Sequence, residues 1–311
     1  MVDKEIQRIK TAVIVPTLNA GLTWEYWIKA LLSAGVNTHD VYVVDSGSTD
    51  NTVQLATKAE FNVRQIEPGT FNHGGTRQEA VTRLAGYDIV VFLTQDAILH
   101  DAESIRNIIS YFESDQVCAV CGRQLPRQNA GAIEAHARLF NYPDTSSTSS
   151  ISDAREKGLK AVFLSNSFAA YRVSALLETG GFPANVIFGE DMYVAARMLK
   201  AGYKIAYAAD ACVYHSHNYS LIQEMKRHFD MGVFHAREPW IRQQFGTAES
   251  EGLKFVVSEI KYLSRHAPWR IPEGILRTIL KYAGFRLGLG ERHIPMKIKR
   301  KISMNPRYFK I

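Results

Sequence analysis

Residues 89–97 read IVVFLTQDA, and this stretch indicates the class of fold. Its first five residues are apolar without a break, as in a strand that is buried on both faces of a parallel sheet. The apolar run then ends abruptly in Thr94, Gln95 and Asp96. Ligands of open α/β sheets bind beyond the carboxyl ends of the strands, so Asp96 stands where a functional carboxylate is expected. The simpler alternative is that Asp96 caps the next helix.

Strand and helix patterns alternate on the N-terminal side of this stretch. Residues 11–15 and 41–44 form short apolar runs, and residues 61–66 suggest a third strand. Between the first two runs, apolar residues recur at the spacing of an amphipathic helix, at Trp24, Trp27, Ile28, Leu31 and Leu32. The turn PTLN follows the first run, and the small polar segment DSGSTD follows the second. Alternating strands and helices predict a parallel sheet with helices packed on it.

A glycine-rich loop, PGTFNHGGTR at residues 68–77, leads into the helix that precedes the central strand. Adjacent Gly74 and Gly75 would let the backbone approach a bulky anion, and a helix N-terminus favours negative charge. Two familiar phosphate-binding signatures are missing, G-x-G-x-x-G after the first strand and G-x-x-x-x-G-K-[ST] anywhere in the sequence. This pattern argues against a dehydrogenase and against a P-loop NTPase.

Two further groups of polar residues follow in the second half of the chain. Residues 188–202, FGEDMYVAARMLKAG, predict a helix with Glu190 and Asp191 in its first turn, where the helix dipole favours the carboxylate form. Residues 210–217, DACVYHSH, predict a strand that ends in His215 and His217, which share one face. We also expect a strand at residues 117–120, a loop or lid at residues 144–153 and a strand at residues 161–164.

The 311-residue chain has the composition of an ordinary globular protein, with 46% hydrophobic and 22% charged residues. No apolar stretch reaches the roughly 18 residues of a membrane-spanning helix, and residues 1–10 contain no apolar run typical of a secretory signal. We therefore expect a cytoplasmic protein. Cys118 and Cys121 have the spacing of a redox or zinc motif, but on the expected strand they would point to opposite faces.

The net charge of +6 is unevenly distributed along the chain. Residues 265–311 contain twelve basic and two acidic residues, a balance of +10, so the remainder carries −4. An apolar helical stripe in this region is formed by Ile275, Leu276, Ile279, Leu280, Ala283 and Leu287, with Arg277 and Lys281 opposite. We expect the stripe to insert into the headgroup boundary of an anionic membrane. The basic residues expected to face acidic lipid are Arg277, Lys281, Lys297, Lys299, Arg300 and Lys301. The alternative is that the stripe packs on the protein body. Nucleic acid is not an expected partner, because no groove-reading motif is present.

Eight segments, taken in order along the chain, resemble an inverting family 2 glycosyltransferase of the GT-A fold. They are VIVPTLNAG, VVDSGSTDNT, FNHGGTRQEAV, VVFLTQDA, SNSFAAYR, GGFP, FGEDMYVAARM and YHSHNYS, and they cover roughly residues 11–237. The resemblance implies an α/β fold with a GT-A-type, Rossmann-like, nucleotide-binding mixed sheet flanked by helices. The FNHGGTR and LTQDA variants are similar to those of bacterial rhamnosyltransferases of surface-polysaccharide assembly, which would use dTDP-L-rhamnose.

The resemblance also implies roles for individual residues. Asp191 matches the catalytic base, and Glu190 beside it would position the acceptor. The donor-binding residues would be Pro16, Thr17, Asn19, Asp45, Gly74, Arg77, Gln95 and Asp96, with Asp45 on the base or ribose. The metal ligands would be Asp96 with His215 or His217. The sequence departs from the family's D-x-D motif, because Thr94 occupies the first acidic position. Mg²⁺ or Mn²⁺ is still the expected cofactor, with the donor diphosphate and a histidine completing the ligand set.

The resemblance leads to a specific expectation about function. We expect L-rhamnose to pass from dTDP-L-rhamnose to a polyprenyl-diphosphate-linked saccharide in O-antigen biosynthesis, at the cytoplasmic face of the inner membrane. Residues 1–238 would form the catalytic domain, and residues 239–311 a helical, basic, membrane-associating region. The alternatives are a UDP- or GDP-linked donor and a non-catalytic sugar-nucleotide-binding scaffold at the membrane. A metal-dependent nucleotidyltransferase is disfavoured, because PTLNAG contains no basic residue.

Overall fold

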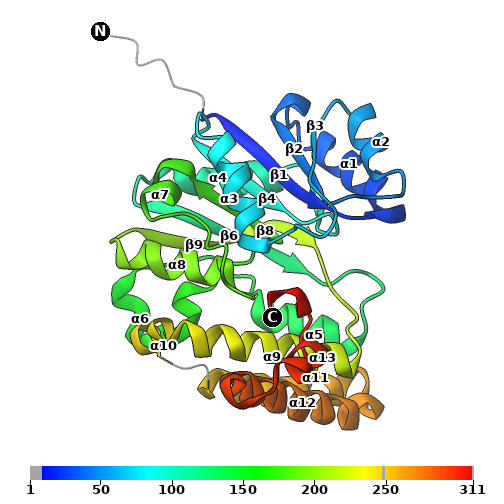
Figure 1. Cartoon of the computed structure of the whole chain (residues 1–311), viewed down its shortest axis with the longest axis vertical. Helices are drawn as coiled ribbons and strands as arrows, with labels where there is room; N and C mark the ends of the chain where they lie inside the picture. The colour runs from blue at the N-terminus through cyan, green and yellow to red at the C-terminus, as the bar shows by residue number, and fades with distance from the viewer. Residues whose placement is uncertain (1–8, 247–248, 310–311) are drawn as a thin grey trace.

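The computed structural model describes residues 9–246 and 249–309. A mixed sheet of nine strands has the order β3-β2-β1-β4-β8-β6-β9-β5, with β7 paired to β9 (Figure 1). The strands are β1 (Thr11–Thr17), β2 (Val41–Asp45), β3 (Asn62–Gln65), β4 (Ile89–Leu93), β5 (Ile98–Leu99), β6 (Val117–Leu125), β7 (Ser147–Ser149), β8 (Phe168–Arg172) and β9 (Lys204–Tyr214). The first four strands are parallel, so their carboxyl ends share one edge. β8 runs antiparallel to both β4 and β6.

Helices cover both faces of the sheet, as the sequence predicts. Side chains of a strand alternate between faces, so Val13 and Val15 of β1 belong to one hydrophobic core, and Ala12 and Ile14 to the other. On the first face lie α1 (Trp24–Ser33), α2 (Thr52–Lys58) and α4 (Ser104–Ser110), and on the second lie α3 (His73–Arg83), α7 (Val173–Glu178) and α8 (Glu190–Lys200). The α/β class and the mixed sheet flanked by helices are confirmed.

The strand predicted at residues 210–217 belongs to β9, which ends at Tyr214, so His215 and His217 follow the strand instead of ending it. Two further segments differ in the type of element. Residues 161–164 are not a strand, because the backbone forms a 3-10 helix over Gly158–Val162. Residues 144–153 are not only a loop, because Ser147–Ser149 forms β7, antiparallel to β9. Both segments are too short to show a periodicity of their own, so their conformation depends on the elements against which they pack.

The C-terminal part of the chain is helical and lies below the sheet in Figure 1. It contains α9 (Leu221–Arg237), α10 (Pro239–Phe245), α11 (Glu249–His266), α12 (Ile271–Leu289) and α13 (Met296–Ile302), and α5 (Ala132–Asn141) and α6 (Ala154–Lys157) pack against it. Glycines let α9 and α12 approach closely. A Cβ at Gly288 would lie 2.2 Å from the carbonyl oxygen of Phe229, and one at Gly284 would lie 2.3 Å from that of Met225. Gly232 on α9 meets α12 in the same way.

Replacing Gly288 by alanine is expected to lower the free energy of unfolding by about 1–3 kcal/mol, because the new methyl group overlaps the backbone of α9. Gly252→Ala on α11 is the matched control, because a Cβ there has no atom within 4 Å. That control should be neutral or stabilising by up to about 1 kcal/mol, from helix propensity alone. Urea denaturation of both variants measures the difference. Equal stability of the two variants would contradict the close packing of α9 on α12.

The orientation of α12 reverses one expectation about the basic region. Arg277 is buried, with its guanidinium 2.9 Å from Glu273 and 3.2 Å from Glu224. Lys281 also turns inward, 3.4 Å from Glu224. The prediction that these two cations face lipid is wrong, because they share the glycine-lined face that packs on α9. Lys299 was placed on the same basic surface, and it is likewise buried and paired with Glu291.

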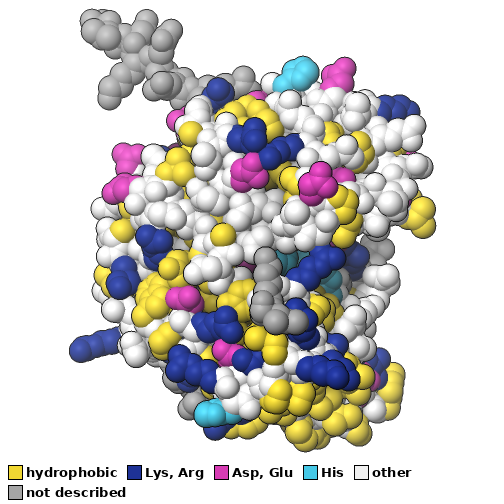
Figure 2. Space-filling view, viewed as in Figure 1, with side chains coloured by type: hydrophobic (Ala, Val, Ile, Leu, Met, Phe, Trp, Pro, Cys, Tyr) yellow, Lys and Arg dark blue, Asp and Glu magenta, His cyan; other side chains and the backbone are white. Residues whose placement is uncertain are grey.

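The apolar stripe of α12 is exposed instead. Ile275, Leu276, Ile279 and Leu287 are between 43% and 57% exposed. Leu253 and Val257 of α11 are 68% and 60% exposed. Figure 2 shows hydrophobic side chains gathered along the lower edge of the molecule, over the position of α12 in Figure 1, with Lys and Arg side chains above them. No helix of the described residues is long and apolar enough to cross a membrane.

Candidate active site

A carboxylate and two histidines meet beyond the ends of β4 and β9. β5 pairs antiparallel with β9, with Ile98 opposite Tyr214, and this register brings the loop that holds Asp96 beside the end of β9. Oδ2 of Asp96 lies 3.3 Å from Nε2 of His215 and 3.6 Å from Nδ1 of His217. Each of the three residues offers one ligand atom within 4.8 Å of the others. The structure therefore brings together the three residues for which metal binding was expected.

Hydrogen bonds fix the tautomer of His215. Its Nδ1 lies 2.7 Å from Oε1 of Gln124, and the same oxygen accepts a 2.8 Å hydrogen bond from Arg138. Because an amide oxygen only accepts, Nδ1 carries the hydrogen and Nε2 of a neutral ring turns its lone pair toward Asp96. Burial lowers the pKa of His215, which favours the neutral ring. A lone pair 3.3 Å from a carboxylate is repulsive unless a cation lies between them, so this donor set fits a divalent metal ion.

Asp96 is held as a carboxylate. Burial by itself raises the pKa of Asp96, but positive charge on the neighbouring imidazoles of His215 and His217, when these rings are protonated, lowers that pKa overall. Burial and His215 lower the pKa of His217 to about 4. Gln95 turns away from this group, because its amide oxygen accepts from Leu18 N–H (2.8 Å) and its amide nitrogen donates to Leu18 C=O (3.1 Å). Gln95 therefore ties the loop after β4 to the loop after β1.

The second polar group lies at the start of α8. Gly189 precedes the helix in the left-handed conformation, with φ of 72°. Glu190 is buried, and its Oε1 lies 3.1 Å from Nη1 of Arg77. Asn166 joins the two carboxylates, because its side chain donates to Glu190 (3.2 Å) and its backbone N–H donates to Asp191 (3.3 Å). Arg77 therefore pairs with Glu190 rather than with Asp191.

Asp191 departs from the full ionisation expected at a helix N-terminus. Burial and the negative charge of Glu190 raise the pKa of Asp191 to about 7. The backbone N–H of Met192 donates to Asp191 at 2.8 Å and offsets only part of this rise. Burial also raises the pKa of Glu190, but Arg77 and His73 lower it overall. The site thus holds one carboxylate that stays ionised and one that accepts a proton near neutral pH, which suits a general base.

The loops after β1 and β2 are organised by Asp45. Its carboxylate is fully buried and accepts hydrogen bonds from the Thr17 hydroxyl (3.0 Å) and the Gly47 N–H (3.0 Å). Pro16 and Thr17 are the last residues of β1, and Asn19 follows with a positive φ of 47°. These residues meet at the carboxyl edge of the sheet. Asp45 shapes the loop in this structure, and its direct contact with a nucleotide stays a prediction.

Gly74 has a packing role that the sequence analysis did not predict. A Cβ at Gly74 would lie 1.8 Å from the carbonyl oxygen of Pro183, and the contact of Gly74 with a donor stays a prediction. Asn72, which caps α3, also donates to the carbonyl of Ala184 at 2.9 Å. Gly74 is therefore required for the close packing of α3 against the loop that leads to Glu190.

A family model described as "Glycosyltransferase like family 2" matches residues 8–230. The chain belongs to glycosyltransferase family 2. It is 45% identical over 302 residues to an O-antigen chain rhamnosyltransferase, RfbN, of Salmonella typhimurium, which covers 97% of this chain and 96% of the relative. It is 46% identical over 298 residues to an O-antigen chain rhamnosyltransferase, WbaN, of Salmonella anatum, which covers 96% of this chain and 95% of the relative.

Solved structures support the fold of this family 2 glycosyltransferase. A mannosyltransferase from Pyrobaculum calidifontis, PcManGT in complex with GDP-Man and Mn²⁺, matches with a TM-score of 0.56 and 18% identity, over 96% of this chain and 84% of that chain. Residues 1–349 of S. aureus TarS match with a TM-score of 0.52 and 17% identity, over 96% of this chain and 88% of that chain.

Several residues of this glycosyltransferase site were missed by the sequence analysis. Asn166 bridges the carboxylates, and Gln124 orients His215, although neither was singled out. Arg227 of α9 packs on two aromatic rings next to the polar groups in sequence, with its guanidinium carbon 4.8 Å from the centre of the Phe188 ring and 5.9 Å from that of Tyr219. Asn166 belongs to the segment SNSFAAYR, which carries the family resemblance but indicates no role for it. No motif marks Gln124 or Arg227, because long-range packing brings them to the site.

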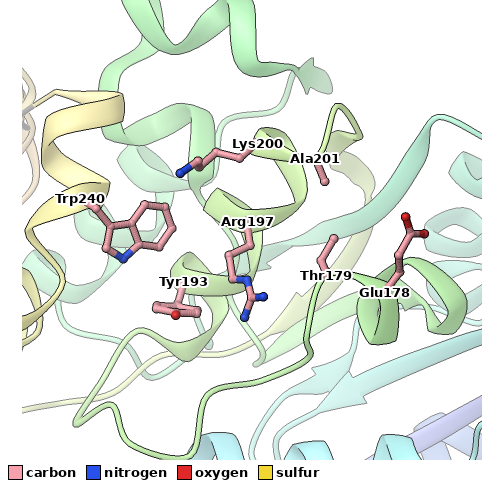
Figure 3. A pocket seen from close by; sticks show the side chains of 7 residues that line it. All are labelled: Glu178, Thr179, Tyr193, Arg197, Lys200, Ala201 and Trp240. Atoms are coloured by element: carbon pink, nitrogen blue, oxygen red, sulfur yellow. The ribbon is translucent and has the colours of Figure 1, made fainter.

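A surface pocket of about 400 Å³ lies on a different side of α8. It is lined by Glu178, Thr179, Tyr193, Arg197, Lys200, Ala201 and Trp240 (Figure 3). Tyr193, Arg197 and Lys200 are spaced by four and three residues, so they share a helix face. None of the residues of the two polar groups lines this pocket, and we assign the reaction to the polar groups instead.

Proposed function

We propose that this family 2 glycosyltransferase moves L-rhamnose from dTDP-L-rhamnose to a polyprenyl-diphosphate-linked saccharide, with inversion, during O-antigen assembly. The observation that carries the proposal is the similarity, along 97% of the chain, to an O-antigen chain rhamnosyltransferase. The arrangement of Asp191 and of the group Asp96, His215 and His217 supports it, because a base and a metal site are the two chemical functions that the reaction needs.

Asp191 would act as the general base. The acceptor hydroxyl must lose a proton as its oxygen attacks the anomeric carbon, and a carboxylate with a pKa near 7 can take that proton. The backbone N–H groups of Met192 and Asn166 hold the Asp191 carboxylate in place, and Arg77 compensates the charge of its neighbour Glu190. A single displacement from the face opposite the nucleotide inverts the anomeric centre.

Asp96, His215 and His217 would hold the divalent ion. Two imidazoles beside one carboxylate suit Mn²⁺ better than Mg²⁺, which prefers oxygen ligands. When bound, the ion would neutralise the negative charge of the departing nucleoside diphosphate. Gln124 would keep Nε2 of His215 free for the ion, because its amide oxygen accepts a hydrogen bond from Nδ1–H.

The donor assignment is tested with a panel of nucleotide-sugars. The purified full chain is incubated with Mn²⁺, a lipid-linked saccharide acceptor and dTDP-L-rhamnose, or with UDP- and GDP-linked sugars, and the glycosylated lipid is measured. We expect transfer from dTDP-L-rhamnose at least about tenfold faster than from any other donor. Faster transfer from a UDP- or GDP-sugar would replace the donor assignment. The acceptors in this assay are ones that a related enzyme rhamnosylates. If the chain binds a donor in their presence but transfers no sugar, the non-catalytic scaffold is favoured over the transferase.

We also propose that residues 239–311 attach the enzyme to an anionic membrane surface, where its lipid-linked acceptor lies. The exposed apolar side chains of α11 and α12 support this attachment, because apolar surface of this kind can enter the headgroup boundary. Lys297 and Lys301 are exposed on α13, and each basic residue near an anionic membrane contributes about 1 kcal/mol. The division between a catalytic domain ending at residue 238 and this region stays part of the proposal.

Replacing Ile279 by glutamate is expected to weaken binding to vesicles that contain anionic lipid by at least about tenfold, because a charge enters the apolar stripe. Leu22→Glu is the matched control, because Leu22 is 94% exposed and lies just before α1, which lies at the opposite end of the molecule from α12 (Figure 1). Co-sedimentation with anionic and neutral vesicles, at low and high salt, measures the binding. Vesicle binding that ignores lipid charge and salt, or that falls equally in both variants, would refute the attachment.

A further inference from the structure

The last described residues, 303–309, form a strap that is fixed to the protein body. Oδ2 of Asp230, a buried residue of α9, accepts hydrogen bonds from the backbone N–H groups of Met304 (3.0 Å) and Asn305 (3.2 Å). Phe309 is only 2% exposed, and its ring centre lies 6.2 Å from that of Phe229. Figure 1 places this red segment between the sheet and the C-terminal helices. The strap is therefore a built part of the fold.

The strap contacts the loop that delivers Glu190 and Asp191. The hydroxyl of Tyr308 donates to the carbonyl of Asn185 at 3.0 Å, and the side chain of Asn305 reaches the carbonyl of Ile187 at 3.4 Å. Tyr308 is itself held by Nη1 of Arg237 at 3.0 Å. One edge of the strap is thus fixed against the catalytic side of the site.

The other edge of the strap contacts the nucleotide side of the site. A Cβ at Gly69 would lie 2.7 Å from Nη1 of Arg307, so the guanidinium packs directly on the loop after β3. Pro68, the preceding residue, packs in turn on Gly47, whose N–H is bound by Asp45. Arg307 therefore stands at the carboxyl edge of the parallel strands, where nucleotides bind in open α/β sheets.

Arg307 is the exposed cation of the strap. No carboxylate of the described residues lies within ion-pair distance of its guanidinium, although Arg237 and Lys299 nearby both pair with Glu291. Arg77, the buried cation of the site, is already paired with Glu190. A guanidinium presents a planar set of donors that matches phosphate oxygens, and it stays charged at all physiological pH values.

We propose that Arg307 is a donor-binding residue that contacts the phosphate groups of the nucleotide-sugar. The inference rests on the proposed function in one respect, namely that the donor is a nucleoside-diphosphate sugar. It extends the active site of this glycosyltransferase to residues 303–309. One edge of the strap would hold the loop that leads to Asp191, and the other edge would contact the donor. The alternative is that Arg307 only supports the loop at Gly69.

The phosphate contact is tested by comparing ligands that differ in phosphate number. Binding of dTDP, dTMP and thymidine to the full chain with Mn²⁺ is measured by calorimetry for the wild type, Arg307→Ala and Arg307→Lys. Arg307→Ala should weaken dTDP binding by about tenfold or more and leave thymidine binding unchanged, since charge-assisted hydrogen bonds to the phosphate oxygens are lost. Arg307→Lys should recover part of the loss. Arg155→Ala, which removes an exposed guanidinium on α6, is the control and should bind dTDP as the wild type does.

Each outcome bears on the proposal. An unchanged dTDP affinity in Arg307→Ala overturns it, and an equal loss for thymidine and dTDP assigns Arg307 to loop support instead. Thermal denaturation of each variant shows whether the fold is intact, and Arg307→Lys carries the test if the alanine variant does not fold. Failure of the wild type to bind dTDP would refute the proposed donor and not the role of Arg307. The same series is then made with the uridine or guanosine nucleotides that the wild type binds.

Discussion

Replacing Asp191 by asparagine is expected to lower kcat by about 10²–10⁴-fold while the affinity for the donor stays close to the wild-type value. The amide keeps the shape of the side chain but cannot accept the proton of the acceptor hydroxyl. Asp191 lies in the group with Asn166 and Glu190, apart from the Asp96 group that would hold the ion, so donor binding should not depend on its charge. Steady-state kinetics with calorimetric titration of dTDP measures the two effects separately.

The pH profile gives an independent readout of the same residue. With a pKa of about 7, Asp191 is protonated in acid and becomes a base as the pH rises through 7. The rate of transfer should therefore rise about tenfold per pH unit below 7 and level off above it, and Asp191→Asn should lose this dependence. Transfer within a few-fold of the wild type, or an unchanged pH profile in the variant, would remove Asp191 from the role of base.

The sheet and its polar strand ends could be read from the sequence because they rest on local patterns. Ile89 to Leu93 forms β4 as an unbroken buried run, and Asp96 lies beyond its end as expected. Glu190 and Asp191 open α8, and His215 and His217 follow β9. Alternation of buried strands and amphipathic helices is encoded within a few residues, so it survives without knowledge of tertiary contacts.

The contacts between distant segments could not be read in this way. The sequence shows that Gly74 has no side chain, but it does not show that the carbonyl of Pro183 lies against it. The periodicity of α12 revealed an apolar face and a basic face without indicating which of them packs inward. Glycines at positions 284 and 288, together with the acceptors around Arg277, decide that the basic face is buried. Close backbone packing and buried ion pairs are properties of two segments, and neither segment carries them alone.

Removal of the divalent ion is expected to abolish transfer, and loss of its ligands should weaken both metal and donor binding. Asp96→Ala removes the one carboxylate of the group, and His215→Ala removes the ligand that Gln124 orients. Each variant should bind Mn²⁺ at least about tenfold more weakly than the wild type, and Gln124→Ala should weaken Mn²⁺ binding by about 10–100-fold through loss of orientation. Calorimetric titration with MnCl₂, together with donor binding in the presence and absence of Mn²⁺, measures these effects.

The exposed pair His100 and Asp101 provides the matched control, because its imidazole and carboxylate lie 2.9 Å apart without a second histidine in the group. His100→Ala should leave Mn²⁺ binding and transfer unchanged. In Asp96→Ala, dTDP binding should fall when Mn²⁺ is present and change little when it is absent, because Asp96 acts on the diphosphate through the ion. Full activity of the wild type in excess chelator would show that the reaction proceeds without metal. That result would require the repulsion between the Asp96 carboxylate and Nε2 of His215 to be relieved by a proton instead.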